Sequence, residues 1–262
     1  MQPLIDHARL FGRLCAVRSA DYARLAAGQS PQALFITCSD SRVVPALITG
    51  ARPGELFELR TAGNVVPSHA QGPTSEAATI EFAVSVLGVS HVVICGHSHC
   101  GAVGALVRGD DLSGAPLVRA WLTGTIGRDR QALSDGGTGT RSRNAPDPLP
   151  GRDRHATPDA GPGAPQDDGI HDGPSDDGAH ALADDGPHAP PCPGLPATPD
   201  DDPALLGAVQ RHVLTQAARL RSYPCVARRL ATGGLRLHAW CYEVHTGAVL
   251  AHRPGTDSFA AL

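Results

Sequence analysis

The sequence contains no lysine, one methionine and few aromatic residues, which make up 4% of its 262 residues. All 22 basic residues are therefore arginines, and they are scattered along the chain. Nucleic-acid interfaces combine clustered basic residues with aromatic side chains, so this composition argues against a nucleic-acid partner. No apolar run approaches the roughly 18 residues of a membrane span. The start, Met1-Gln2-Pro3, lacks the basic and apolar regions of a secretory signal. We therefore expect neither membrane insertion nor export.

The cysteines show no regular spacing that would indicate a disulfide framework. There are seven of them: Cys15, Cys38, Cys95, Cys100, Cys192, Cys225 and Cys241. Cysteines that serve as thiolate ligands favour a reducing compartment. We therefore expect a cytoplasmic protein.

Two apolar runs, residues 33–37 and 91–95, are each bounded by polar or glycine residues, which predicts two buried strands. The segments that follow them are Cys38-Ser39-Asp40-Ser41-Arg42 and His97-Ser98-His99-Cys100-Gly101. In an open α/β sheet, side chains just past the carboxyl ends of the strands gather in one crevice. We therefore expect the two segments to meet there.

Cys38, His97 and Cys100 form a soft set of three donors, and Zn²⁺ with three protein ligands keeps a fourth position for water or substrate. This pattern predicts one catalytic zinc ion per chain. The His-x-x-Cys spacing alone has an equally good alternative, because buried cysteines often serve as small apolar residues. Asp40 and Arg42 favour the metal site, since a charged pair at a strand end costs desolvation unless it has a function.

Periodicity and turn signals predict a single α/β domain with a central, mostly parallel sheet. Helices are expected within 4–27, 43–49, 74–87, 100–108, 117–122, 204–220 and 224–230, and further strands at 56–59, 235–244 and 249–251. The alternation in 235–244 suits an edge or half-covered strand. A helix starting near Cys100 would place that thiol at a helix N-terminus, which should lower its pKa.

Residues 127–203 differ sharply in composition from the remainder of the chain. They contain 15 aspartates, 6 arginines and almost no large apolar residue, so they carry a formal charge of −9. The remainder carries +5, since the whole chain has −4. Such a segment cannot bury enough surface to offset its ordering entropy. We therefore expect a disordered acidic insertion within one domain formed by 1–126 and 204–262.

Three motifs resemble those of the β-class carbonic anhydrases: Cys-x-Asp-x-Arg at 38–42, His-x-x-Cys at 97–100, and an Arg-x-x-Gly-Asn-like stretch at 60–64. The resemblance covers residues 1–123 and 204–262. It implies a mostly parallel β-sheet flanked by helices. It also implies a helical arm at 1–27 that exchanges across a homodimer or higher homo-oligomer. The implied reaction is zinc-dependent, reversible hydration of CO₂ to bicarbonate and a proton by zinc-bound hydroxide.

The resemblance also assigns roles to individual residues. Cys38, His97 and Cys100 would bind zinc, and Asp40 and Arg42 would form the catalytic dyad. Four residues would bind or line the path of the substrate: Gln29, Phe57, Gly63 and Phe82. Phe35 stands where the bicarbonate-inhibited members carry a tryptophan, and His69 and His99 are candidate proton shuttles by their proximity in sequence.

Two alternatives remain at this stage. Carbonyl sulfide and carbon disulfide hydrolases resemble this family in ligands and fold, and only the width of the pocket and its access would separate them. A second alternative is a catalytically silent zinc protein whose insertion binds a partner. All five ligand and dyad positions are intact, which favours the enzyme.

Overall fold

The structure is a computed structural model, which describes residues 1–17, 19–125 and 202–262, with only the backbone at 19–21 and 125. The predicted insertion, except for Asp202 and Pro203, lies outside the described residues. In the part of the chain that is described, no helix is both long and apolar enough to cross a membrane.

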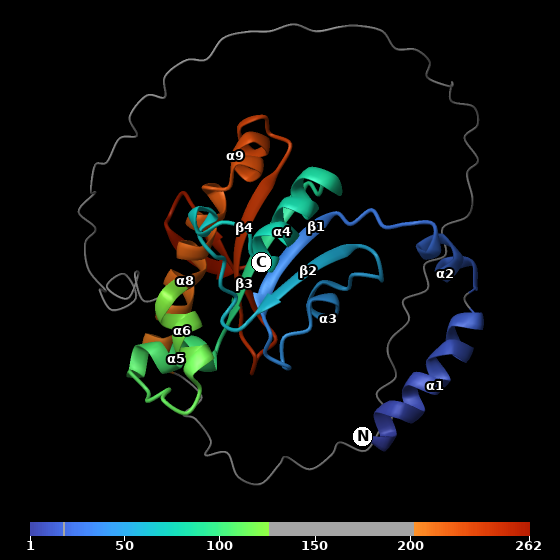
Figure 1. The fold of residues 1–262 in the computed structure, drawn as a ribbon, viewed down its shortest axis with the longest axis horizontal. Coiled ribbons are helices and arrows are strands. Elements are labelled where there is room, and N and C mark those ends of the chain that lie inside the picture. Colours follow the sequence, from blue (N-terminus) through green and yellow to red (C-terminus); the bar gives the residue numbers. More distant parts are fainter. Residues whose placement is uncertain (18, 126–201) are drawn as a thin grey trace, which may run out of the picture. The chain divides into compact units, whose positions relative to one another are not determined.

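In the described part of the chain, one sheet of six strands organises the fold, in the order β2-β1-β3-β4-β5-β6. Figure 1 labels four of them, β1 to β4. The strands are β1 Ala33–Cys38, β2 Leu56–Thr61, β3 His91–His97, β4 Arg236–Tyr242, β5 Val249–Arg253 and β6 Ser258–Ala261. Strands β2, β1, β3 and β4 run parallel, and β5 and β6 are antiparallel additions. The predicted mostly parallel sheet flanked by helices is therefore confirmed.

The helices follow the expected ranges closely. They are α1 Gln2–Val17, α2 Ser19–Ala26, α3 Pro45–Thr49, α4 Ser75–Glu81, α5 Gly101–Arg108, α6 Pro116–Thr125, α8 Pro203–Arg221 and α9 Pro224–Ala231, with a short 3₁₀ helix η1 at His69–Gln71. Capping residues set several ends. Thr74 Oγ1 accepts a hydrogen bond from the Ala77 N–H at the start of α4. Gly109 ends α5 at φ 70°, a left-handed conformation that glycine adopts readily.

The main core lies on one face of the sheet, where α8 packs on β3 and β4. Leu34, Ile36, Val92 and Ile94 point into this core and are fully buried. The opposite face carries a smaller apolar cluster with Phe35, whose ring packs edge-on against Trp240 at a centroid distance of 6.0 Å. Within the described ranges, no helix residue belongs to that smaller cluster.

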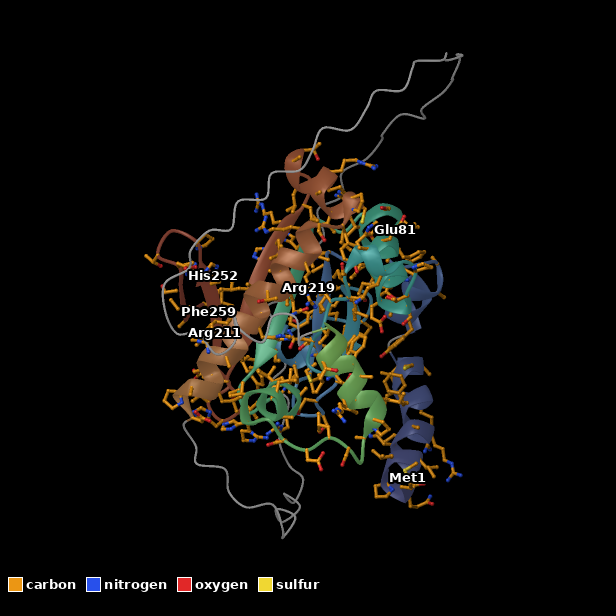
Figure 2. The ribbon with its side chains drawn as sticks, turned by 60° about the vertical axis from the view of Figure 1, so that its left-hand side comes forward. Met1, Glu81, Arg211, Arg219, His252 and Phe259 are labelled. Atoms are coloured by element: carbon orange, nitrogen blue, oxygen red, sulfur yellow. The ribbon has the colours of Figure 1, made fainter. Side chains whose placement is uncertain are left out.

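Four details differ from the expectations drawn from the sequence or narrow them. Of the two positions expected for β4, the structure has the half-covered one: most of its residues are partly buried, and it pairs with β3 on one side and with β5 on the other. Strand β6 was not expected, and it follows a turn in which Asp257 takes φ 48°. His252 and Phe259 pack across the β5–β6 pair, with ring centroids 5.3 Å apart (Figure 2). The expected helix at 74–87 continues beyond α4 as a π-helical turn, η2 Phe82–Val86.

The fourth difference concerns the boundary expected at 203. Asp202 and Pro203 belong to the start of α8, because Asp202 Oδ1 accepts hydrogen bonds from the N–H groups of Ala204 and Leu205. An aspartate that caps a helix and a proline in its first turn are both favoured there. Their acidic and proline-rich composition made them look like the insertion.

Candidate metal centre

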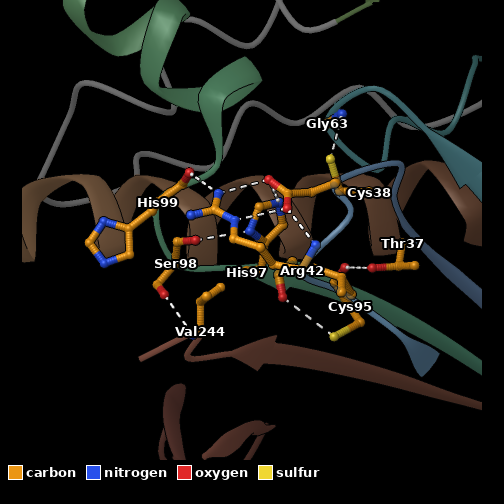
Figure 3. Close-up of polar contacts among 12 residues, drawn as sticks. Thr37, Cys38, Arg42, Gly63, Cys95, His97, Ser98, His99 and Val244 are labelled. Carbon is orange, nitrogen blue, oxygen red and sulfur yellow. Dashed lines mark hydrogen bonds and ion pairs between the residues drawn. The ribbon is translucent and has the colours of Figure 1, made fainter. Parts of the chain in front are cut away.

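The sheet brings Cys38, His97 and Cys100 together. Figure 3 labels two of them, Cys38 and His97. Cys38 is the last residue of β1 and His97 the last of β3, while Cys100 is the N-cap of α5. Their ligand atoms all lie within 4.8 Å of one another, and all three residues are buried. Parallel neighbouring strands end at the same edge of the sheet, which explains why residues 59 positions apart converge.

The His97 ring is oriented as a metal ligand would be. Its Nδ1 lies 2.9 Å from the carbonyl oxygen of Ser98, so Nδ1 carries the proton and donates it. Its Nε2 is buried and has no hydrogen-bond partner. A buried, unpaired imidazole nitrogen costs free energy, and a metal ion among the three donors would satisfy it. The Ser98 hydroxyl accepts a hydrogen bond of 2.9 Å from the Val244 N–H, which holds this turn against the end of β4.

The two thiols behave differently from each other. The hydrogen bond from the Cys100 thiol lowers the pKa of Cys38 to about 4, and contacts with His97 and the Gly63 N–H act in the same direction. The pKa of Cys100 is raised instead, because its thiol shares a proton with Cys38 and is buried. The predicted lowering at the helix N-terminus is therefore wrong for this thiol pair. The N–H groups of Ala102 and Val103 do lower the pKa of Cys100, but the proton shared with Cys38 and the burial of the thiol raise it by more.

Asp40 and Arg42 form a two-point ion pair beside the donors. Arg42 Nε lies 2.9 Å from Asp40 Oδ1, and Arg42 Nη2 lies 2.8 Å from Asp40 Oδ2. Arg42 Nη2 also donates to the carbonyl oxygen of His99 at 3.1 Å. The hydrogen bond from Arg42 lowers the pKa of Asp40 to about 2, so the carboxylate stays ionised near neutral pH. Asp40 Oδ2 lies 3.8 Å from His97 Nε2, which places the carboxylate next to the metal donors.

Arg60, from β2, holds the loop that carries both Cys38 and Asp40. Its Nη2 donates to the carbonyl oxygens of Cys38 at 3.0 Å, Asp40 at 2.8 Å and Val43 at 2.7 Å. Its Nε donates to Cys38 O as well, at 3.2 Å. The planar guanidinium offers several donors in a fixed arrangement, so one side chain fixes three carbonyl groups of the loop.

Comparison with known proteins decides the family. The family model described as carbonic anhydrase matches residues 33–145. The carbonic anhydrase of Pseudomonas aeruginosa is 35% identical over 264 residues, covering 100% of this chain and 92% of the relative. That of Synechococcus elongatus is 33% identical, covering 95% of this chain and 71% of the relative. The solved β-carbonic anhydrase CcaA matches with a TM-score of 0.72 and 28% identity, covering 100% of this chain and 99% of that one. This chain belongs to the β-class carbonic anhydrases.

The residues expected around the substrate of this carbonic anhydrase lie in three different environments. Gly63 is beside the metal donors, where its N–H donates to Cys38 Sγ at 3.4 Å (Figure 3). Phe57 and Phe82 lie together, with ring centroids 5.9 Å apart, and Phe82 is 42% exposed. Gln29 is exposed in the link between α2 and β1, where it makes no hydrogen bond within the described part of the chain.

The two candidate proton shuttles, His69 and His99, line two separate cavities. His69 packs on Tyr223 and lines a cavity of about 490 Å³. His99 adopts φ 56° and lines a cavity of about 260 Å³, where its ring lies 6.1 Å from that of His245. The carbonyl oxygen of His99, and not its ring, contacts the dyad.

Sequence reasoning missed two polar residues of α8, His212 and Gln216, which form hydrogen bonds with the backbone of Gly63 and Val66 after β2. Both are fully buried. They occupy positions i and i+4 of the apolar stripe of the helix, so periodicity placed them correctly but indicated only packing. A polar pair inside an apolar stripe was the signal that could have identified them.

Proposed function

We propose that this carbonic anhydrase hydrates CO₂ reversibly to bicarbonate and a proton, with one Zn²⁺ per chain held by Cys38, His97 and Cys100. The observation that carries the proposal is the buried His97 Nε2, which has no partner and lies among two sulfur donors within 4.8 Å. Two thiolates and one imidazole suit zinc, and three protein ligands leave room for water. When bound, zinc supplies a Lewis acid that lowers the pKa of a water molecule toward neutrality.

Asp40 would orient the attacking oxygen. Its ionised carboxylate only accepts hydrogen bonds, so it accepts one from the attacking water and turns a lone pair of that oxygen toward the carbon of CO₂. Arg42 keeps the carboxylate ionised and fixes its plane by the two-point contact. Without Arg42, the carboxylate could rotate toward the three donors, because its Oδ2 is already 3.8 Å from His97 Nε2.

We further propose that Gln29, Phe57, Gly63 and Phe82 bind or guide the substrate. The adjacent rings of Phe57 and Phe82 support an apolar path, which suits the apolar CO₂ molecule. The exposed position of Gln29 is compatible with a contribution to a neighbouring subunit.

Two uncovered apolar surfaces support a homodimer built through the arm at 1–27. Helix α1 has no buried residue and exposes six large apolar side chains: Leu4, Ile5, Leu10, Phe11, Leu14 and Val17. On the smaller-cluster face of the sheet, the large apolar side chains of Leu56 and Trp240 are only partly buried and line a cavity of about 250 Å³. Burial of these surfaces against a second copy would remove apolar area from water.

The state of the cysteines supports the proposed cytoplasmic location. Every cysteine of the described ranges is a free thiol: Cys15, Cys38, Cys95, Cys100, Cys225 and Cys241. A reducing compartment would preserve both the ligand thiolates and the buried thiols.

Zinc content and the rate of CO₂ hydration, measured on the same samples, test the proposal. We expect about one zinc ion per chain, and an activity that rises toward alkaline pH because two thiolates offset the charge of the metal. Arg42→Ala should keep its zinc but lose about a hundredfold in rate, the scale of effect of misplacing a reacting group. Arg108→Ala is the matched control, because Arg108 makes a similar two-point contact with Asp110 on the surface. A metal-free wild type, or full activity in Arg42→Ala, would contradict this mechanism.

A further inference from the structure

Two buried polar side chains of α8 form a chain of hydrogen bonds that leads to the metal centre. His212 Nε2 lies 2.7 Å from the carbonyl oxygen of Gly63. Gln216 Nε2 lies 3.3 Å from His212 Nδ1, and Gln216 Oε1 accepts a hydrogen bond of 2.9 Å from the Val66 N–H. These contacts join α8 to the segment after β2 across about 150 residues of sequence.

The donors and acceptors along this chain determine where the proton of His212 lies. The Val66 N–H is a donor, so the atom of Gln216 that faces it must be the amide oxygen. The amide NH₂ of Gln216 then faces His212 Nδ1, which has to accept. The proton of the imidazole is therefore on Nε2, where it is donated to Gly63 O. The Val66 N–H thus fixes the orientation of the Gln216 amide, and that amide leaves His212 Nε2–H as the donor to Gly63 O.

Gly63 in turn touches a metal donor with its backbone. Its N–H donates to Cys38 Sγ at 3.4 Å. Gly63 has φ +76°, and a Cβ there would lie 3.0 Å from Ala102 Cβ, so this approach to the sulfur requires glycine. Trp121 Nε1 donates to Ala62 O at 3.0 Å, at the other end of the peptide unit that carries the Gly63 N–H. The peptide unit is thus held between α6 and the sulfur, and the next carbonyl is held by α8.

We propose that His212 is a positioning residue for the metal centre: by its hydrogen bond to Gly63 O it keeps the Gly63 N–H on Cys38 Sγ. This inference rests on the proposed function, since it requires Cys38 to bind the metal. An N–H donor draws charge from a thiolate, so it controls how strongly that sulfur donates to the metal. Loss of His212 would free the 62–64 turn to move and would leave Cys38 with a weaker hydrogen bond.

The test compares His212→Leu with wild type after exchange of the metal for Co²⁺, which reports sulfur bonding through a thiolate-to-cobalt charge-transfer band. We expect the band to shift to longer wavelength in His212→Leu, because the thiolate becomes richer in charge. We also expect zinc to pass to a chelator about tenfold faster, because the freed 62–64 turn no longer holds the Cys38 sulfur in place and this loss outweighs the stronger donation by the thiolate. His212→Gln keeps an N–H donor at a similar reach and should restore most of the wild-type band.

Leu220→Ala is the matched control for a loss of packing. Leu220 is a fully buried residue of the same helix and belongs to the main core, so its truncation destabilises α8 without touching Gly63. Its charge-transfer band and zinc release should match those of wild type. If His212→Leu loses stability as Leu220→Ala does but keeps the wild-type band and release rate, His212 only fills the core and the proposal is overturned.

Two further outcomes separate the possible failures. If His212→Leu does not fold, His212→Met replaces it, because methionine is a flexible apolar side chain that fills the space without an N–H donor. A band shift in His212→Met supports the proposal, and an unchanged band overturns it. If wild type itself binds neither Zn²⁺ nor Co²⁺, the proposed function fails first. Metal binding in wild type with no change in these variants refutes the role of His212 alone.

Discussion

At Gly96, the strand that carries His97 packs against the helix that carries His212 with no room for a side chain. A Cβ at Gly96 would lie 2.6 Å from Val213 Cγ2 and 2.8 Å from Val209 Cγ1, both shorter than real carbon contacts. The substitution Gly96→Ala therefore forces β3 and α8 apart. It adds one methyl group and no charge, so its effect measures this contact directly.

The magnitude follows from the stiffness of the two valines. Val209 is 1% exposed and Val213 is fully buried, and β-branched side chains in a helix are largely confined to one rotamer. Neither can turn away, so the backbone must move. Overpacking of this kind costs about 1 to 3 kcal/mol. For a domain of this size the midpoint of thermal unfolding, Tm, should fall by about 2 to 12 °C. His97 is the next residue, so zinc release should also become faster.

Urea unfolding and zinc release to a chelator provide the assays. Gly124→Ala is the control, because a Cβ at Gly124, in α6, meets no atom within 4 Å. It should leave stability unchanged or raise it slightly, since alanine favours a helix. Adding Val213→Ala to Gly96→Ala should recover part of the loss, because the shortest contact is then removed. A free energy of unfolding for Gly96→Ala within about 0.5 kcal/mol of wild type would refute the reasoning.

Three further predictions concern single side chains. Arg60→Leu should lower the CO₂ hydration rate at least tenfold, because four hydrogen bonds to the ligand loop are lost. Arg60→Lys should not restore the rate, because the lysine side chain is one bond shorter than the path to Arg60 Nη2, which contacts all three carbonyl oxygens, and it has no Nε donor; full recovery would contradict this. Burial raises the pKa of Tyr223 from 10.0 to about 12. Its contribution to stability should therefore be complete below pH 10 and lost as pH rises through 12. In Tyr223→Phe, the free energy of unfolding measured with urea should therefore fall less steeply with pH between about 10 and 12 than in wild type. Equal slopes for the two proteins would contradict the raised pKa of Tyr223. Asp202→Ala should cost about 1 kcal/mol by thermal unfolding, because it removes the cap of α8. Asp202→Asn should keep most of the stability that the cap provides, because asparagine is also a good N-cap residue. An unchanged Tm for Asp202→Ala would show that Asp202 does not stabilise α8.

Much of the fold could be predicted because local signals agreed with it. The run that forms β1 is apolar at nearly every position, as suits a strand buried on both faces, and β1 is indeed wholly buried. Thr74 and Gly109 marked helix ends by their capping chemistry. The position of β4 could be predicted only as either an edge or a half-covered strand, because the polar–apolar alternation of its sequence suits both. Its pairing with β5 depends on a chain reversal and not on its own side chains.

The electrostatics of the site were predictable only in part. The Asp40–Arg42 pair is local, since the two residues are two positions apart in the sequence, and in the structure they form a two-point contact. Which thiol ionises first could not be read from the sequence. The helix N-terminus acts on Cys100, but the shared proton and the burial of that thiol reverse its effect.

The sequence by itself determined the candidate donor set of this carbonic anhydrase, because Cys38 and His97 end two parallel strands that pairing brings to one edge of the sheet, and Cys100 follows three residues after His97. Only the tertiary structure decided which residues contact the backbone next to those donors. The hydrogen bond from His212 to Gly63 joins segments about 150 residues apart, and its direction depends on the orientation of the Gln216 amide. Such contacts arise from how α8 packs on the sheet, and no pattern along the chain encodes them.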